Sequence, residues 1–94
     1  MRIVADMSLY PLKDGPIPTI IEFIEDLQAQ PGIEVVTNQL GTQIRGEFED
    51  VTNAIKHCTR KAMNAPNTVV LVVKYLNIDV EIARTPSLTP PGPK

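Results

Sequence analysis

The residues best suited to bind a small molecule in this sequence are uncharged and lie in three separate segments. Hydroxyl and carboxamide groups donate and accept hydrogen bonds without adding charge, and an aromatic ring can cover a flat ligand. Such a set could bind a small uncharged heterocycle if the fold brings the segments together. The alternative is that Ser, Thr and Asn only satisfy turns and strand ends. The residues are Ser8 and Tyr10, then Thr37, Asn38, Gln39, Gly41 and Thr42, and finally Asn67 and Thr68.

Other reactive side chains fit structural roles better than catalytic ones. His57 and Cys58 are adjacent, and neighbouring residues on a helix point about 100° apart, so they cannot act as a nucleophile and its base. We expect a buried Cys58 thiol and a surface His57. Glu47, Glu49 and Asp50 stand where a helix should begin, which favours capping and dipole roles over a metal site. The sequence therefore predicts no catalytic residue, no metal site and no cofactor.

Length and charge exclude several function classes. The chain has 94 residues, of which 43% are hydrophobic and 21% charged, enough for one small domain. A net charge of −2 argues against a nucleic-acid surface. A single cysteine allows no internal disulfide, and no uncharged apolar run is long enough to span a membrane. We expect a soluble, cytoplasmic protein without nucleic-acid or membrane partners.

The positions that could bind a ligand must be held by six elements in the order β-α-β-β-α-β. This order indicates an α+β, ferredoxin-like sandwich, with an antiparallel sheet of order 4-1-3-2 and two helices on one face. We expect residues 1–82 to form this single domain and residues 83–94, which are rich in proline, to form a mobile tail. The strands are predicted at residues 2–10, 33–39, 42–48 and 68–76, and the helices between Pro16 and Pro31 and from Glu49 to about residue 62.

Apolar spacing predicts which face of each helix is buried. The apolar stripe of the first helix is Ile17, Ile20, Ile21, Ile24 and Leu27, and that of the second is Val51, Ala54, Ile55, Cys58 and Ala62. The basic residues Lys56, Arg60 and Lys61 of the second helix are expected to form a solvated helix end.

Two further expectations concern the strand ends. Gly41 follows Leu40 in the turn between the second and third strands, where glycine can adopt a positive φ. Ile78, Val80 and Ile82 alternate with polar residues and could prolong the fourth strand beyond Asn77.

The fourth strand is apolar at alternate positions of both parities, from Val69 to Val73. Because both helices cover one sheet face, the other face would expose the second apolar set to water, which favours association. We therefore expect self-association through the open sheet face, as a homodimer or a homotetramer.

In this topology the end of the first strand lies beside the start of the third, which brings Ser8 near Thr42. Their parity differs, because Thr42 shares its face with Ile44 and Ser8 shares the opposite face with Val4 and Asp6. The two side chains can therefore line one pocket only at the end of the sheet or across a bulge.

Two motifs resemble a known family. Ser8-Leu9-Tyr10-Pro11-Leu12 follows the first strand, and Leu40-Gly41-Thr42-Gln43-Ile44-Arg45-Gly46-Glu47 leads into the second helix. In this order and at this distance, they resemble the thiamine-binding (YkoF-like) family from about Val4 to Asn77. Its members bind thiamine or its hydroxymethylpyrimidine part, are not known as enzymes and assemble through sheet faces. Because this chain carries the unit once, the resemblance implies that a second copy comes from another subunit.

The resemblance also implies a ligand site near the turn between the second and third strands. Ser8 and Thr42 would hydrogen-bond the aminopyrimidine, and Tyr10 would form an apolar or stacking wall. The expected ligand-binding residues are Ser8, Tyr10, Thr37, Asn38, Gly41 and Thr42.

Other functions of this fold find less support. Acyl phosphate hydrolysis needs an arginine in the loop after the first strand, and residues 11–18 offer only Lys13. Metal chaperones need a Cys-x-x-Cys pair, and RNA binding needs more aromatic residues than this chain has. A regulatory or structural oligomer that binds another small metabolite, or none, remains the alternative.

Overall fold

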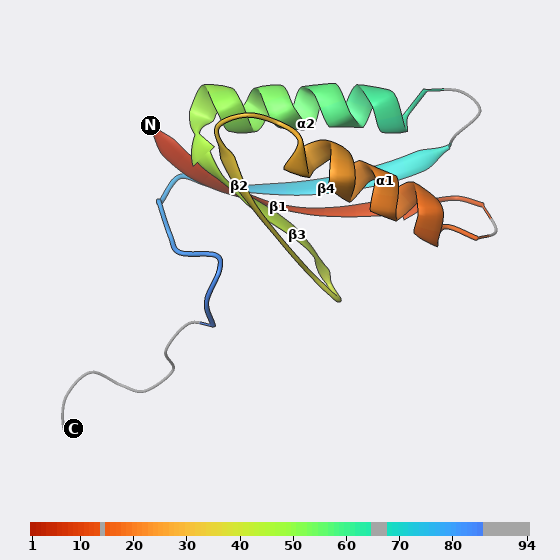
Figure 1. Cartoon of the computed structure of the whole chain (residues 1–94), viewed down its shortest axis with the longest axis horizontal. Helices are drawn as coiled ribbons and strands as arrows, with labels where there is room; N and C mark the ends of the chain where they lie inside the picture. Colours follow the sequence, from red (N-terminus) through yellow and green to blue (C-terminus); the bar gives the residue numbers. More distant parts are fainter. Residues whose placement is uncertain (14, 65–67, 86–94) are drawn as a thin grey trace.

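The sheet is organised around its first strand. β1 (Arg2–Pro11) lies between β3 (Gly41–Glu47) and β4 (Val69–Leu76), and β2 (Ile33–Asn38) pairs with β3, always antiparallel. α1 (Ile17–Gln28) and α2 (Phe48–Ala62) cover one face (Figure 1). This computed structural model describes residues 1–13, 15–64 and 68–85. The predicted α+β, ferredoxin-like fold and its strand order 4-1-3-2 are confirmed.

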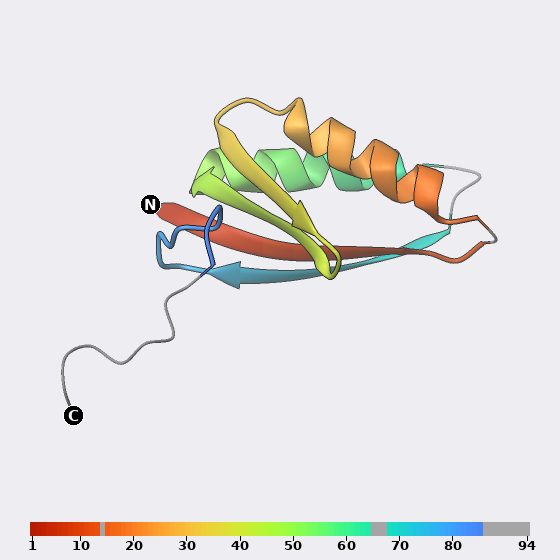
Figure 2. The same cartoon turned by 60° about the horizontal axis from the view of Figure 1, so that its bottom comes forward.

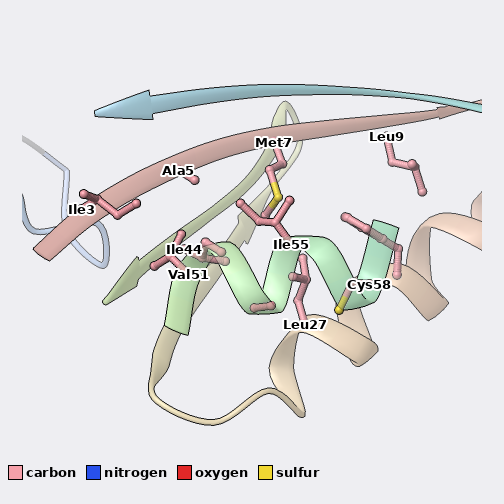
Figure 3. Packing of buried hydrophobic residues seen from close by; sticks show 11 residues of the cluster. Ile3, Ala5, Met7, Leu9, Leu27, Ile44, Val51, Ile55 and Cys58 are labelled. Atoms are coloured by element: carbon pink, nitrogen blue, oxygen red, sulfur yellow. The ribbon is translucent and has the colours of Figure 1, made fainter. Parts of the chain in front are cut away.

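The core lies between this face of the sheet and the two helices. Alternate residues of β1 point into it, from Ile3 through Ala5 and Met7 to Leu9 (Figure 3). The predicted stripe of α2 is confirmed, because its first four members are buried and Ala62 packs against them. α2 also begins with two acids and ends with two bases, an order that complements the helix dipole.

The predicted buried face of α1 is only partly right. Phe23 and Leu27 are its buried residues, whereas Ile17 and Ile21 are 60% and 50% exposed. The sequence contains apolar residues around much more of this helix than one face can bury. Phe23 has the largest apolar side chain in the helix, so facing its ring toward the sheet removes the most area from water and leaves Ile17 and Ile21 outside.

β4 ends at Leu76, so the predicted prolongation through Ile78, Val80 and Ile82 is wrong. Leu76 already pairs with Val4, close to the first residue of β1, and little strand remains to pair with. The chain after β4 instead turns onto the face opposite the helices (Figure 1). We call residues 78–82 the return segment. Most of the expected proline-rich tail, from residue 86 on, lies outside the described residues.

Candidate functional site

A cavity of about 250 Å³ lies where the end of β1 and the β2–β3 turn meet α1. We call it the neutral pocket, because none of the described residues that line it carries a charge. It brings together all six residues predicted as ligand-binding, and Gln39. The lining residues are Met7, Ser8, Leu9 and Tyr10 from β1, Ile20, Phe23 and Ile24 from α1, and Thr37 to Thr42 from the turn and its flanks.

Asn38 shapes the turn beside the neutral pocket. Its Oδ1 accepts hydrogen bonds from the backbone N–H groups of Leu40, at 2.9 Å, and Gly41, at 3.2 Å. Its Nδ2 donates to Gln43 Oε1 at 3.1 Å, and Gln43 Nε2 donates to Asp6 Oδ1 at 2.8 Å. The Asn38 carboxamide is therefore largely occupied in fixing the chain reversal.

Gly41 does not adopt the positive φ that the turn suggested, since the only glycines with positive φ in the described chain are Gly15 and Gly32. Its small size matters for a different reason. A Cβ at this position would lie 2.7 Å from the Met7 carbonyl oxygen and 3.1 Å from Ser8 Oγ. Glycine therefore allows β3 to approach β1 closely at the mouth of the pocket.

The hydroxyl groups of the pocket form two separate contacts. Thr42 is only 5% exposed, and its Oγ1 lies 3.0 Å from Thr37 Oγ1. Ser8 Oγ donates to the Leu40 carbonyl oxygen at 3.2 Å. Ser8 and Thr42 lie on opposite faces and share the cavity at the end of the sheet, as their parity required. Because one threonine hydroxyl donates to the other, the pair keeps one O–H free to donate to a ligand.

Two rings border the pocket. Tyr10 is 53% exposed and pairs with Val70 in the sheet, so it stands at the rim, whereas Phe23 is buried. Phe23, Ile20 and Ile24 form a wall that the sequence interpretation missed. Their spacing of three and four residues was the available signal, because such residues share one helix face.

The third polar segment does not contribute to the pocket as described. Thr68 uses its backbone carbonyl to accept a hydrogen bond from the Leu12 N–H at 2.9 Å, and its side chain does not line the cavity. Asn67 lies outside the described residues.

The reactive side chains away from the pocket behave structurally. His57 is exposed and Cys58 is buried, as predicted. Burial raises the pKa of the Cys58 thiol to about 11, which keeps it protonated near neutral pH. No group of three or more His, Cys, Asp or Glu in the described chain could hold a metal ion. Neither described helix is long and apolar enough to cross a membrane.

Lys61 is exposed, as expected for a solvated helix end, and it is also paired. Its Nζ donates to Asp26 Oδ1 at 3.0 Å and lies 3.8 Å from Glu22 Oε1, so it links α2 to α1. The hydrogen bond to Asp26 raises the pKa of Lys61.

Charged residues gather at the end of β3 away from the turn, on the open face. Arg45 Nε donates to Asp79 Oδ1 at 2.8 Å, and its guanidinium lies within 4 Å of Glu34 and Glu81. Arg2 Nε donates to Asp79 Oδ2 at 3.1 Å. We call these five residues the ionic cluster. The hydrogen bond from Arg45 is the main cause that lowers the pKa of Asp79.

Comparison with known proteins adds a family and several structural relatives. The model of the YKOF-related family matches residues 3–79. Protein SP2199 from Streptococcus pneumoniae is 25% identical with a TM-score of 0.75, over 85% of this chain and 90% of that chain. Hypothetical protein MJ1052 from Methanocaldococcus jannascii is 24% identical with a TM-score of 0.69, over 93% and 88%.

A further relative carries a functional description. TM0486 from Thermotoga maritima, described as a candidate thiamine biosynthesis/salvage protein, is 18% identical with a TM-score of 0.62, over 87% of this chain and 91% of that chain. No curated protein matches the sequence.

Proposed function

The chain belongs to the YKOF-related family, and from this premise we propose that it is a non-catalytic binding protein for thiamine or its hydroxymethylpyrimidine moiety. The observation that carries the proposal is the neutral pocket, which gathers Ser8, Tyr10, Thr37, Asn38, Gly41 and Thr42 around one cavity. The thiamine description of the Thermotoga relative supports the same ligand class.

The size and charge of the pocket favour a single uncharged ring. Its volume of about 250 Å³ lies below the roughly 300–1,000 Å³ typical of sites for drug-sized ligands. The lining combines hydroxyl groups with the apolar wall of α1, and its described residues are all uncharged. An aminopyrimidine has a donor amine and acceptor ring nitrogens, which such groups can satisfy without a counter-ion.

The roles of three side chains follow from their contacts. The free O–H of the Thr37–Thr42 pair would donate to a ring nitrogen, and a threonine oxygen would accept from the exocyclic amine. Tyr10, at the rim, would cover one side of the ring.

A thermal-shift comparison tests the ligand. A ligand at 100 times its dissociation constant stabilises the folded state by about 2.7 kcal/mol, which raises the melting temperature by on the order of 10 °C in a domain of this size. Hydroxymethylpyrimidine and thiamine should both produce such a shift. If neither does and another heterocycle does, the alternative of a different small metabolite replaces this proposal.

Calorimetry on Thr42→Val tests the site. Loss of one neutral hydrogen bond costs about 1 kcal/mol, so affinity for hydroxymethylpyrimidine should fall about fivefold or more. The fold should persist, because the partner hydroxyl of Thr37 is on an exposed residue and can turn to water. Thr52→Val is the matched control, since Thr52 donates to the Phe48 carbonyl within α2. Unchanged affinity in Thr42→Val removes Thr42 from the site.

The open sheet face supports self-association as part of the same proposal. Val70 and Val72 of the edge strand β4 are each 45% exposed and lie opposite Tyr10 and Ser8. An apolar patch beside a strand edge is a favourable contact surface for a second copy. Light scattering should therefore show a dimer or tetramer at micromolar concentration, and Val72→Lys should dissociate it. Met63→Lys adds the same charge on the helix side and should not. A monomeric wild type contradicts this part of the proposal.

A further inference from the structure

A second and larger crevice, of about 720 Å³, lies on the helix side of the sheet between α2 and β4. Both elements run past each other in Figure 1. Leu71 and Tyr75 of β4 line it from the sheet, where they share the face of the core residues Leu9 and Ala5 with which they pair. Ile55 and Met63 line it from α2. We call it the basic groove, because Lys56 and Arg60 also line it.

Two cations stand along the helical side of this groove. Lys56 and Arg60 are four residues apart, so they occupy the same side of α2 at successive turns. Neither has a carboxylate within ion-pair distance among the described residues, whereas the neighbouring Lys61 has two. In a chain with a net charge of −2, a pair of unneutralised cations on the rim of this crevice makes the groove complementary to an anion.

The rest of the groove is suited to an apolar body. Ile55 is buried at its base, while Met63 and the ring of Tyr75 are 49% and 56% exposed. An exposed aromatic ring beside apolar side chains can pack against a flat ligand, and Met adapts to irregular shapes. The groove thus combines an apolar surface with a cationic rim.

Thr59 adds a polar group that lacks a partner. Its Oγ1 is buried and forms no hydrogen bond within the described chain, although Thr59 lines the groove between Lys56 and Arg60. Threonine in a helix has two accessible χ1 rotamers, so its hydroxyl can rotate to a second staggered position. A bound anion would give this hydroxyl an acceptor.

We propose that the basic groove is a second ligand site, distinct from the neutral pocket, which binds a small organic anion that consists of an apolar ring and a phosphate or carboxylate group. The anionic group lies between Lys56 and Arg60, and the ring packs against Tyr75, Met63 and Leu71. The two sites differ in chemistry, because among the residues that the structure describes the neutral pocket is lined by uncharged side chains and the groove by two cations.

Titration of the full chain with phenyl phosphate, followed by amide and methyl NMR shifts, tests the proposal. Shifts should concentrate on residues of α2 and β4, including Ile55, Met63 and Leu71, with a dissociation constant of roughly 1 mM or below. Inorganic phosphate and benzyl alcohol carry the two halves of the probe separately, and each should bind more weakly than phenyl phosphate. Benzoate compares the carboxylate with the phosphate.

A variant with Lys56→Gln and Arg60→Gln removes both cations from exposed positions. It should weaken phenyl phosphate binding at least about tenfold, because charge-assisted hydrogen bonds are lost. Lys74→Gln is the matched control, since Lys74 is an exposed cation of β4 on the opposite sheet face. Equal weakening by Lys74→Gln, an unaffected double variant, or no shift on α2 and β4 in the wild type each overturns the proposal. The pyrimidine titration reports on the β2–β3 turn, so the two sites fail independently.

Discussion

The two ends of β3 are fixed by different kinds of interaction. At one end, the neutral pocket uses hydroxyl and carboxamide groups, with Thr42 paired to Thr37 and Asn38 bound to the backbone of its own turn. At the other end, the ionic cluster uses exposed charges, with Arg45 bound to Asp79 of the return segment. Figure 2 shows β3 running from the turn toward the region where the chain after β4 comes back to the sheet.

The two ends of β3 therefore differ in how they respond to pH and salt. Neutral hydrogen bonds within a partly buried turn do not depend on pH between the acid and alkaline extremes, so the pocket keeps its shape across that range. Exposed ion pairs are screened by salt and lost when one partner is neutralised. The neutral end is therefore suited to ligand binding, while the ionic end fixes the return segment to the sheet by ion pairs.

The largest expected effect comes from the two glycines at opposite ends of β3. A Cβ on Gly41 would lie 2.7 Å from the Met7 carbonyl oxygen, and one on Gly46 would lie 2.7 Å from the Gly32 carbonyl oxygen. Backbone cannot move aside as a side chain can, so Gly41→Ala and Gly46→Ala should each lower the free energy of unfolding by about 1–3 kcal/mol. Chemical denaturation measures this loss.

The glycine pair also separates structure from binding. Only Gly41→Ala disturbs the mouth of the neutral pocket, so it alone should weaken hydroxymethylpyrimidine binding in calorimetry of the folded protein. Equal weakening by Gly46→Ala would mean that the pocket depends on the whole of β3 rather than on its turn. Wild-type stability in Gly41→Ala would mean that β1 and β3 are not held as close as the structure describes.

The sequence could predict the sheet because β1 alternates between apolar and polar residues from Ala5 to Leu9, although Val4 on the opposite face is also buried. The core side of β1 consists of Ile3, Ala5, Met7 and Leu9. A shift of the strand register by one residue would place Asp6 in the core instead, so only one register buries apolar side chains. The sequence could not predict where β4 stops. Ile78 and Val80 continue the alternation, but the end depends on how much of β1 remains to pair and on the contact between Asp79 and Arg45, which are distant in sequence.

The pocket was predictable in its residue types and less so in its contacts. Placing Ser8 near Thr42 needed only topology, and both line the cavity. That Ser8 donates to Leu40, and that Asn38 fixes its own turn, depend on side-chain rotamers that no sequence pattern specifies. Phe23 was missed because the isoleucines of α1 offered a competing face with similar spacing.

The next largest effect should come from Arg45→Gln, which removes the shared partner of the ionic cluster. Arg45 contacts Glu34, Asp79 and Glu81, so its loss should release the return segment while the sheet stays folded. Limited proteolysis near Ile82 should accelerate, and amide exchange at Val80 should rise. Ligand binding at the neutral pocket should stay within about twofold of wild type. Weakened pyrimidine binding would show that the two ends of β3 are coupled.

Acid should release the return segment, as Arg45→Gln does, but it should have little effect near neutral pH. Contact with Arg45 lowers the pKa of Asp79 below its ordinary value of 3.8. A lowered folded-state pKa contributes stability that is present above 3.8 and lost as pH falls through the lower folded value. The return segment should therefore remain bound at about pH 5 and detach only as the pH falls well below 3.8, as followed by NMR shifts of Val80. Asp79→Asn should remove this transition, and its persistence in that variant would assign it to another carboxylate.

The smallest effect should come from Tyr10→Phe at the neutral end. Tyr10 is half exposed, and if its ring forms a wall for the ligand, its hydroxyl is dispensable. Affinity for hydroxymethylpyrimidine should change less than about twofold in Tyr10→Phe, whereas Tyr10→Ala should weaken it about three- to tenfold through loss of a ring contact of about 0.5–1.5 kcal/mol. Because Tyr10 also borders the exposed Val70, both variants need a light-scattering control to separate ligand contact from self-association. A large loss in Tyr10→Phe would assign a hydrogen bond to the phenol, and this would make the rim of the pocket as polar as its base.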